Sequence, residues 1–198
     1  MKIQSFIYGL SLLFLSPAFC PAHPHVFVDC TFTLVFDTNG FSGIREQWVF
    51  DEMFSSTLLK DFDKDKNSLL NSQEIADIKE GAFNNLKNLN YFNHIIINGK
   101  NFSTKFVAEF FAEVRENHLV YTFFIPCHVK AISQFKTIRL AVYDETYYTD
   151  IAFAPGRLSI EGSKDLFSVQ CTTKPAEDLT FYYGQIVPDA IFLKFKNK

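Results

Sequence analysis

An acidic stretch at residues 63–74 constrains the fold of this chain more than any other segment. It reads DKDKNSLLNSQE, with oxygen-bearing side chains at alternate positions in its first half. This spacing is typical of an EF-hand calcium loop, in which positions 1, 3, 5, 7, 9 and 12 supply oxygen ligands to one ion and a helix flanks each end. The sequence therefore predicts a calcium site between two helices. Its expected ligands are the side chains of Asp63, Asp65, Asn67, Asn71 and Glu74 and the backbone carbonyl of Leu69.

One position of the loop departs from the usual pattern. Position 6 is normally Gly, because the loop turns there with a positive φ, but this chain has Ser68. A side chain in that conformation costs on the order of 1 kcal/mol. We therefore expect a weak site, with a dissociation constant of roughly tens of micromolar to millimolar. A polar turn without an ion is the alternative interpretation. Because sensor EF-hands usually work in pairs and this loop is single, a structural clamp is expected rather than a sensor.

Apolar residues at helical spacing flank the loop on both sides. Before it, a helix is predicted from Asp51, whose acidic side chain suits a helix N-terminus. After it, Ser72 is the expected N-cap of a second helix that ends at residues 88–90. A helix–loop–helix insertion is therefore expected at about residues 51–89. Its predicted apolar stripes are Met53, Phe54, Leu58 and Phe62, then Ile75, Ile78, Ala82, Phe83 and Leu86.

The rest of the chain alternates between apolar and polar residues, as β-strands with one buried face do. Hydrophobic residues make up 47% of the chain and include 24 Phe, which is enough material for a large core. Regularly spaced short strands predict an antiparallel β-sandwich, in one domain over residues 23–198, with the helix–loop–helix inserted after the second strand. The predicted strands are residues 25–36, 41–50, 92–97, 102–114, 119–125, 137–143, 147–153, 167–172 and 179–184.

Residues 1–22 have the features of a secretory signal peptide. A basic start precedes an apolar run at residues 6–15, which is too short to cross a membrane as a stable helix. We expect cleavage after Ala22 and export to the periplasm. A lipid anchor on Cys20 is a less favoured alternative, because the residue before it is bulky. No later apolar run is long enough to span a membrane, so the processed protein is not expected to be transmembrane.

Cleavage after Ala22 would create a second candidate metal site. The free amine and imidazole of His23 can chelate one ion, and His25 lies close enough to add a nitrogen. Imidazole ligands suit zinc, nickel, cobalt and copper. Pro24 has no amide N–H, which blocks the square-planar copper mode that needs a deprotonated amide at the second residue. The alternative is that both histidines merely lead into the first strand.

Three cysteines remain in the expected mature chain, Cys30, Cys127 and Cys171. No CxxC pair occurs, so neither a zinc knuckle nor a thioredoxin-type motif is present. Buried free thiols are the favoured interpretation, although one disulfide is compatible with an oxidising compartment. His118 lies in a predicted turn and is expected to be solvated.

Charge and motifs argue against several functional classes. The formal net charge of −3 favours neither nucleic-acid binding nor a polybasic membrane surface. The chain has no Gly-rich nucleotide loop, no Ser/His/Asp constellation and no HExxH pattern. We therefore do not expect an enzyme.

Four stretches of the sequence together carry a resemblance to a known family. They are AHPHVFVDC at 22–30, QWVFDEMFSSTLLKDFDKDKNSLLNSQE at 47–74, YFNHIIINGK at 91–100 and YDETYYTDIAF at 143–153. In combination they resemble the bacterial family of domain of unknown function 1007, often labelled an uncharacterised ABC-type transport system, periplasmic component. The resemblance implies an exported protein that handles a transition metal, with an inner-membrane metal transporter as partner. His23, His25, Asp29, Asp63, Asp65 and Glu74 match the family pattern, whereas Ser68 departs from its usual loop Gly.

Two functional hypotheses follow from these observations. The first is an exported metal-binding accessory protein of a divalent transition-metal transport system of nickel/cobalt/zinc type, with a structural calcium loop. The alternative is a calcium-stabilised protein-interaction module without transition-metal binding, whose exposed aromatic residues, such as Tyr147 and Tyr148, meet a partner.

Overall fold

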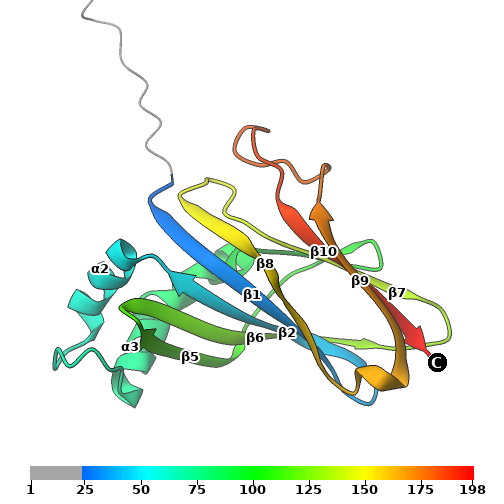
Figure 1. Cartoon of the computed structure of the whole chain (residues 1–198), viewed down its shortest axis with the longest axis horizontal. Helices are drawn as coiled ribbons and strands as arrows, with labels where there is room; N and C mark the ends of the chain where they lie inside the picture. Colours follow the sequence, from blue (N-terminus) through cyan, green and yellow to red (C-terminus); the bar gives the residue numbers. More distant parts are fainter. Residues whose placement is uncertain (1–23) are drawn as a thin grey trace, which may run out of the picture.

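The structure is a computed structural model that describes residues 24–198, except for the side chains of residues 154–157. Its strands form two five-stranded sheets, and two α-helices lie at one end of the first sheet (Figure 1). The prediction of a mainly β protein is therefore confirmed.

The first sheet has the strand order β5-β6-β2-β1-β8. β1 (Val26–Phe36) and β2 (Gly40–Phe50) form an antiparallel hairpin, and β6 (His118–Lys130) and β5 (Ala108–Arg115) extend it. Every second residue of β1 is buried, as the alternation in the sequence predicts. On the other side of β1, β8 (Thr149–Gly162) runs parallel to it.

The second sheet has the strand order β4-β3-β7-β10-β9, and its neighbouring strands are antiparallel. Its strands are β3 (Asn93–Ile97), β4 (Lys100–Phe102), β7 (Lys136–Val142), β9 (Phe167–Pro175) and β10 (Asp189–Asn197).

The two sheets share one hydrophobic core. Phe36 of β1 packs edge-on against Phe195 of β10 with ring centroids 5.3 Å apart, and Phe195 also contacts Phe41 of β2. Towards the helical end, Trp48 of β2 stacks on Phe92, the residue before β3. Burial of these large aromatic surfaces between the sheets is the main force that holds them together.

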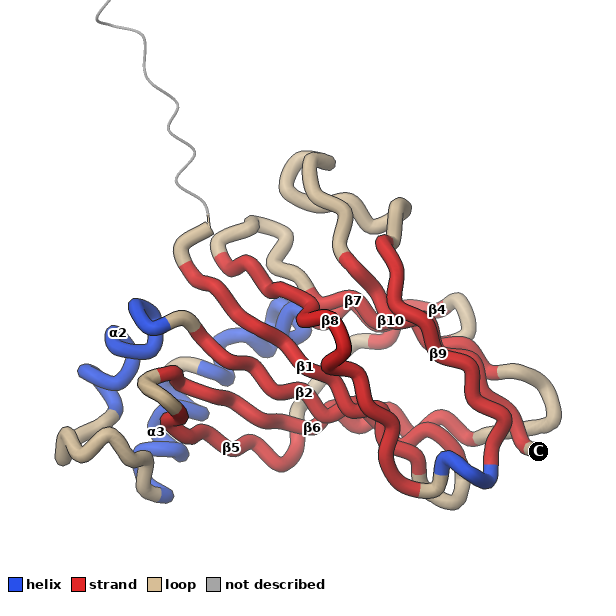
Figure 2. The backbone as a smooth tube through the Cα atoms, viewed as in Figure 1, coloured by secondary structure: helices blue, strands red, loops and turns tan. Residues whose placement is uncertain are grey.

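The helices lie between β2 and β3 in the chain. They are α2 (Glu52–Phe62), α3 (Ser72–Gly81) and the 3-10 segment η2 (Phe83–Phe92), and a 3-10 turn, η3 (Lys164–Leu166), precedes β9. Figure 2 shows the loop between α2 and α3 at the outer end of the molecule, with α3 beside β5. Among residues 24–198, no helix is both long enough and apolar enough to cross a membrane.

The predicted helix after the acidic loop was too long and had the wrong cap. α3 ends at Gly81, and η2 follows with a kink at which Asn90 and Tyr91 have positive φ. Asn71, rather than Ser72, is the N-cap of α3. The apolar spacing that suggested one long helix arises because residues of α3 and η2 pack on the same core.

Several strand predictions were also wrong. The pairing of β1 with β8 is parallel, which alternation within a strand cannot reveal, so the fold is not wholly antiparallel. Residues 102–114 are not one strand: β4 ends in the second sheet and β5 begins in the first, with Phe106 exposed between them. Residues 179–184 form turns with an isolated bridge from Phe181 to Ile186, and the last strand is β10, which was not predicted.

Candidate functional site

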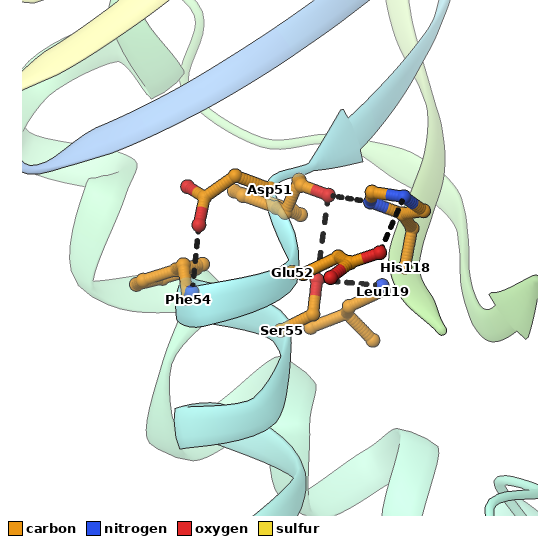
Figure 3. A network of polar contacts seen from close by, with 7 residues as sticks. Asp51, Glu52, Phe54, Ser55, His118 and Leu119 are labelled. Carbon is orange, nitrogen blue, oxygen red and sulfur yellow. Dashed lines mark hydrogen bonds and ion pairs between the residues drawn. The ribbon is translucent and has the colours of Figure 1, made fainter. Parts of the chain in front are cut away.

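Figure 3 shows the polar contacts that fix the start of α2 against the first sheet. Asp51 caps the helix, because its Oδ1 accepts the Phe54 N–H at 2.9 Å. Its Oδ2 accepts the Phe27 N–H of β1, also at 2.9 Å. One carboxylate thus joins the helix to the first strand of the sheet.

Ser55 and His118 reinforce this junction from the first turn of α2 and the start of β6 (Figure 3). The buried Ser55 hydroxyl donates to the Phe50 carbonyl and accepts the Leu119 N–H at 2.8 Å. Nδ1 of His118 lies 2.6 Å from the same Phe50 carbonyl oxygen, so this nitrogen carries a proton and donates, while Nε2 lies 4.0 Å from Glu52. The expectation of a solvated turn histidine at His118 was therefore wrong.

The acidic loop begins and ends on helix caps. Asp63 is the C-cap of α2, with its N–H bonded to the Leu59 carbonyl at 3.0 Å. Asn71 Oδ1 accepts the N–H groups of Gln73 and Glu74, and Glu74 Oε2 accepts the Asn71 N–H at 2.9 Å. This reciprocal capping box fixes both the start of α3 and the Glu74 carboxylate.

Three carboxylates converge inside the loop. The ligand oxygens of Asp63, Asp65 and Glu74 lie within 4.8 Å of one another, and Asp63 and Glu74 are only 7% and 2% exposed. Glu74 Oε1 accepts the Lys64 N–H at 2.7 Å, and Asp63 Oδ2 accepts the Ser68 N–H at 2.9 Å. Within residues 24–198, the ion pairs all involve other carboxylates. Backbone amides therefore hold three carboxylates that form no ion pair with a basic side chain in the described part of the chain.

The remaining predicted ligands lie on the same loop but bond within it. Asn67 donates its side-chain amide to Asp65 at 2.8 Å and accepts the Leu69 N–H at 2.6 Å. Asn71 uses its side-chain oxygen to cap α3. Ser68 has a φ of 62°, the left-handed conformation expected at loop position 6. The structure thus brings three predicted acids together, and an all-oxygen donor set of this kind fits a hard cation such as calcium.

The predicted histidine site is described only in part, because His23 lies outside the described residues. The side chain of His25, the residue before β1, is exposed, and its ring centroid lies 5.0 Å from that of Tyr148. The backbone N–H of His25 donates to the Tyr148 carbonyl at 2.9 Å. Within residues 24–198, the group of three or more potential metal ligands is Asp63, Asp65 and Glu74, and His25 is not part of it.

The three cysteines are free thiols in the structure. Cys30 is buried, and Cys127 and Cys171 are half-buried. Burial raises the pKa of Cys30 and Cys171, and it raises the pKa of Cys127 to about 12. Thiols held in their neutral form are poor nucleophiles and metal ligands, so these residues contribute packing rather than chemistry.

A cavity of about 580 Å³ lies beside the helices, and sequence reasoning missed it. Phe54 of α2, Phe83 of η2 and Trp48 of β2 line its interior, and the segment that connects β7 to β8 forms its polar rim. The lining residues lie far apart in the chain, so no local sequence pattern predicts the cavity. The rim includes Tyr148, one of the two tyrosines that the sequence suggested as exposed aromatic residues.

The rim of this cavity is held by a bonded turn. Asp144 Oδ1 accepts the N–H and hydroxyl of Thr146 at 2.9 and 2.7 Å, and Oδ2 accepts the Thr149 N–H at 3.1 Å. Beside this turn, the Tyr143 ring stacks on His94 with centroids 3.7 Å apart. Burial lowers the pKa of His94, with its bond to the Tyr143 carbonyl and the charge of Glu145 acting in the opposite direction. His94 is therefore neutral near pH 7.

These features define a two-sheet, mainly β protein with a cluster of carboxylates between two helices and an apolar cavity beside them. The chain belongs to the family described as "Protein of unknown function (DUF1007)", which matches residues 7–179.

Two relatives match most of the chain. An uncharacterised 15.5 kDa protein encoded in the trpE 3′ region of Spirochaeta aurantia is 29% identical over 140 residues, which cover 69% of this chain and 96% of that protein. An uncharacterised protein of Haemophilus influenzae is 28% identical over 158 residues, which cover 78% of this chain and 72% of the relative.

Proposed function

We propose that this protein binds one calcium ion at residues 63–74, in an EF-hand-like manner, and that the ion clamps α2 to α3. The convergence of Asp63, Asp65 and Glu74 carries this proposal. Like charges this close repel one another, and a divalent cation between them would replace the repulsion by attraction. Asp63 would hold the ion from the end of α2 and Glu74 from the first turn of α3.

Thermal unfolding in calcium and in a chelator tests this proposal. Asp65→Asn removes one ligand charge at an exposed position, and Asp61→Asn is the matched control because Asp61 is exposed just before the loop. We expect calcium to raise the Tm of the wild type and of the control by about 3 °C or more. Asp65→Asn should lose most of that shift. Equal Tm values for the wild type with and without calcium would contradict the proposal.

We further propose that the protein is exported to the periplasm and serves a divalent transition-metal transport system of nickel/cobalt/zinc type, together with an inner-membrane transporter. The signal-peptide pattern and the resemblance of the sequence support this role. A transition ion would be held by the amine and ring of His23 and by His25, and the exposed position of His25 leaves room for such a chelate.

The histidine site has its own test. Isothermal titration of the processed protein with zinc, nickel, cobalt and copper is compared with the variant that carries both His23→Ala and His25→Ala. We expect the variant to lose transition-metal binding and to retain the calcium-dependent rise in Tm. Equal transition-metal affinity of the two proteins would rule out this site.

A calcium-stabilised interaction module without a transition metal is the second candidate. Exposed tyrosines favour it, because Tyr148 is 50% and Tyr183 is 92% exposed, and tyrosine is enriched at protein interfaces. In this case no transition ion binds, and the double-histidine variant behaves as the wild type does.

A further inference from the structure

We propose that the cavity beside α2 binds a small molecule that has an apolar body and a protonated amine. This inference does not depend on the calcium site, because it rests on the walls and rim of the cavity. At about 580 Å³, the cavity falls within the range of about 300–1,000 Å³ typical of small-molecule sites. Phe54 and Leu58 of α2 and Phe83 and Leu86 of η2 form much of its apolar wall.

A buried hydroxyl without a partner indicates that the cavity is built for an occupant. Tyr121 of β6 lines the cavity, is only 3% exposed, and its hydroxyl has no hydrogen-bond partner in the described part of the chain. Its ring is fixed by Phe50, Phe83 and Phe110, with centroids 4.8, 5.8 and 5.3 Å away. Buried polar groups in native proteins are almost always hydrogen-bonded. The hydroxyl is covered by neighbouring atoms, so an oxygen in the body of a ligand would supply the missing partner once the surrounding rings move apart.

The charge around the cavity selects the head group of the ligand. Asp144 and Glu145 are among the lining residues, and the described lining contains neither Lys nor Arg. The oxygens of Asp144 accept hydrogen bonds from the rim turn, and Glu145 is exposed. Since His94 is neutral near pH 7, an anionic head group would meet only like charge. A cationic head group would meet two carboxylates.

Aromatic rings at the rim suit a cation as well. Tyr143 and His94 form a stacked pair there, and Tyr148 lines the same opening. Tyr143 is stacked between His94 and Phe181, so both of its faces are covered. An ammonium group would therefore gain from the negative face of the Tyr148 ring. We place the amine between Glu145 and Tyr148, with the apolar body directed towards Trp48 and Tyr121.

Fluorescence of the protein reports binding directly, because Trp48 is the only Trp in the chain and lines the cavity. The probes are dodecylamine, dodecanol and dodecanoate, used below their micelle concentrations, with calorimetry as a second readout. We expect dodecylamine to bind about fivefold or more tighter than dodecanol, and dodecanoate to bind weakest. Dodecanoate that binds as tightly as dodecylamine would overturn the proposal, and so would the absence of any response to all three probes.

Two variants locate the contacts. Glu145→Gln should bring the affinity for dodecylamine close to that for dodecanol, whereas Glu177→Gln, an exposed acid outside the cavity lining, should not change it. Tyr121→Phe should weaken an amine with an ether oxygen in its chain by roughly fivefold and leave dodecylamine unchanged. If Glu145→Gln lowers the Tm, the role of charge is tested instead by measuring how salt changes the affinity of the wild type for dodecylamine. Affinities that respond to neither Glu145→Gln nor salt would overturn the assignment of the head group.

Discussion

The indole N–H of Trp48 donates a hydrogen bond of 2.9 Å to Oε2 of Glu46 inside the core between the two sheets. Glu46 is 0% exposed, and its other oxygen and the amide oxygen of Asn93 have no well-formed bond within residues 24–198. Burial raises the pKa of Glu46 to about 8, with the side chains of Trp48 and Asn93 acting in the opposite direction. Glu46 is therefore mainly protonated near pH 7. In this form its O–H group can donate a hydrogen bond to one of these oxygens.

The buried acid predicts that stability falls as the pH rises. The pKa of Glu46 is higher in the folded chain, so the folded state binds the proton more tightly than the unfolded state does. Below the ordinary pKa of 4.5, Glu46 is protonated in both the folded and the unfolded state, so the cost of burying its charged form is absent. Between 4.5 and about 8 the free energy of unfolding should fall by up to about 1.4 kcal/mol per pH unit, and above that range the loss is complete.

Glu46→Gln should remove this part of the pH dependence, because a side-chain amide does not titrate. Its oxygen still accepts the Trp48 N–H, and its NH₂ group replaces the acid O–H as a donor. Denaturant unfolding between pH 5 and pH 9 measures the slope, and Glu177→Gln is the exposed control. A slope in Glu46→Gln as steep as that of the wild type would contradict the prediction.

The two bonds of Asp51 predict a graded loss of stability. Asp51→Ala removes both the cap of α2 and the link to Phe27, and we expect a cost of about 1–3 kcal/mol in the free energy of unfolding. Asp51→Asn keeps an acceptor for the Phe54 N–H but presents a donor to the Phe27 N–H, so it should cost less. Urea unfolding measures the order of stability of the three proteins. Equal stability of the wild type and Asp51→Ala would refute the prediction.

The left-handed conformation of Ser68 predicts a stabilising substitution. Ser68→Gly should raise the free energy of unfolding by about 0.5–1 kcal/mol, because Gly adopts a φ of 62° without steric cost. Ser72→Gly is the control, since Gly in the first turn of α3 should destabilise the protein. Ser68→Gly that destabilises as much as Ser72→Gly would show that the strain is absent.

The sequence predicted what depends on local patterns. The alternation of β1 and the turn before β2 gave a hairpin that the structure contains almost residue for residue. The spacing of the acidic loop identified Asp63, Asp65 and Glu74, which the structure brings together. Such features are set by neighbours in the chain, so they can be recognised without knowing the fold.

Features set by distant neighbours could not be predicted in this way. The parallel partner of β1 begins at Thr149, and nothing in either strand encodes that pairing. Glu46 lies on a strand whose alternation places it on the inner face, but its burial depends on Trp48 and Asn93 closing around it. The cavity likewise forms only where α2, η2 and the loop after β7 lie side by side, and this arrangement is set by the tertiary structure.

Isothermal titration of calcium into the purified protein tests the central claim most directly. The wild type is compared with Glu74→Gln, which lacks the buried carboxylate at the end of the loop, and with Glu80→Gln, an exposed acid of α3. The account predicts one calcium per chain with a dissociation constant of roughly tens of micromolar to millimolar, the same value for Glu80→Gln, and no detectable binding for Glu74→Gln. A wild type that binds no calcium, or a Glu74→Gln variant that binds it as tightly, would contradict the account.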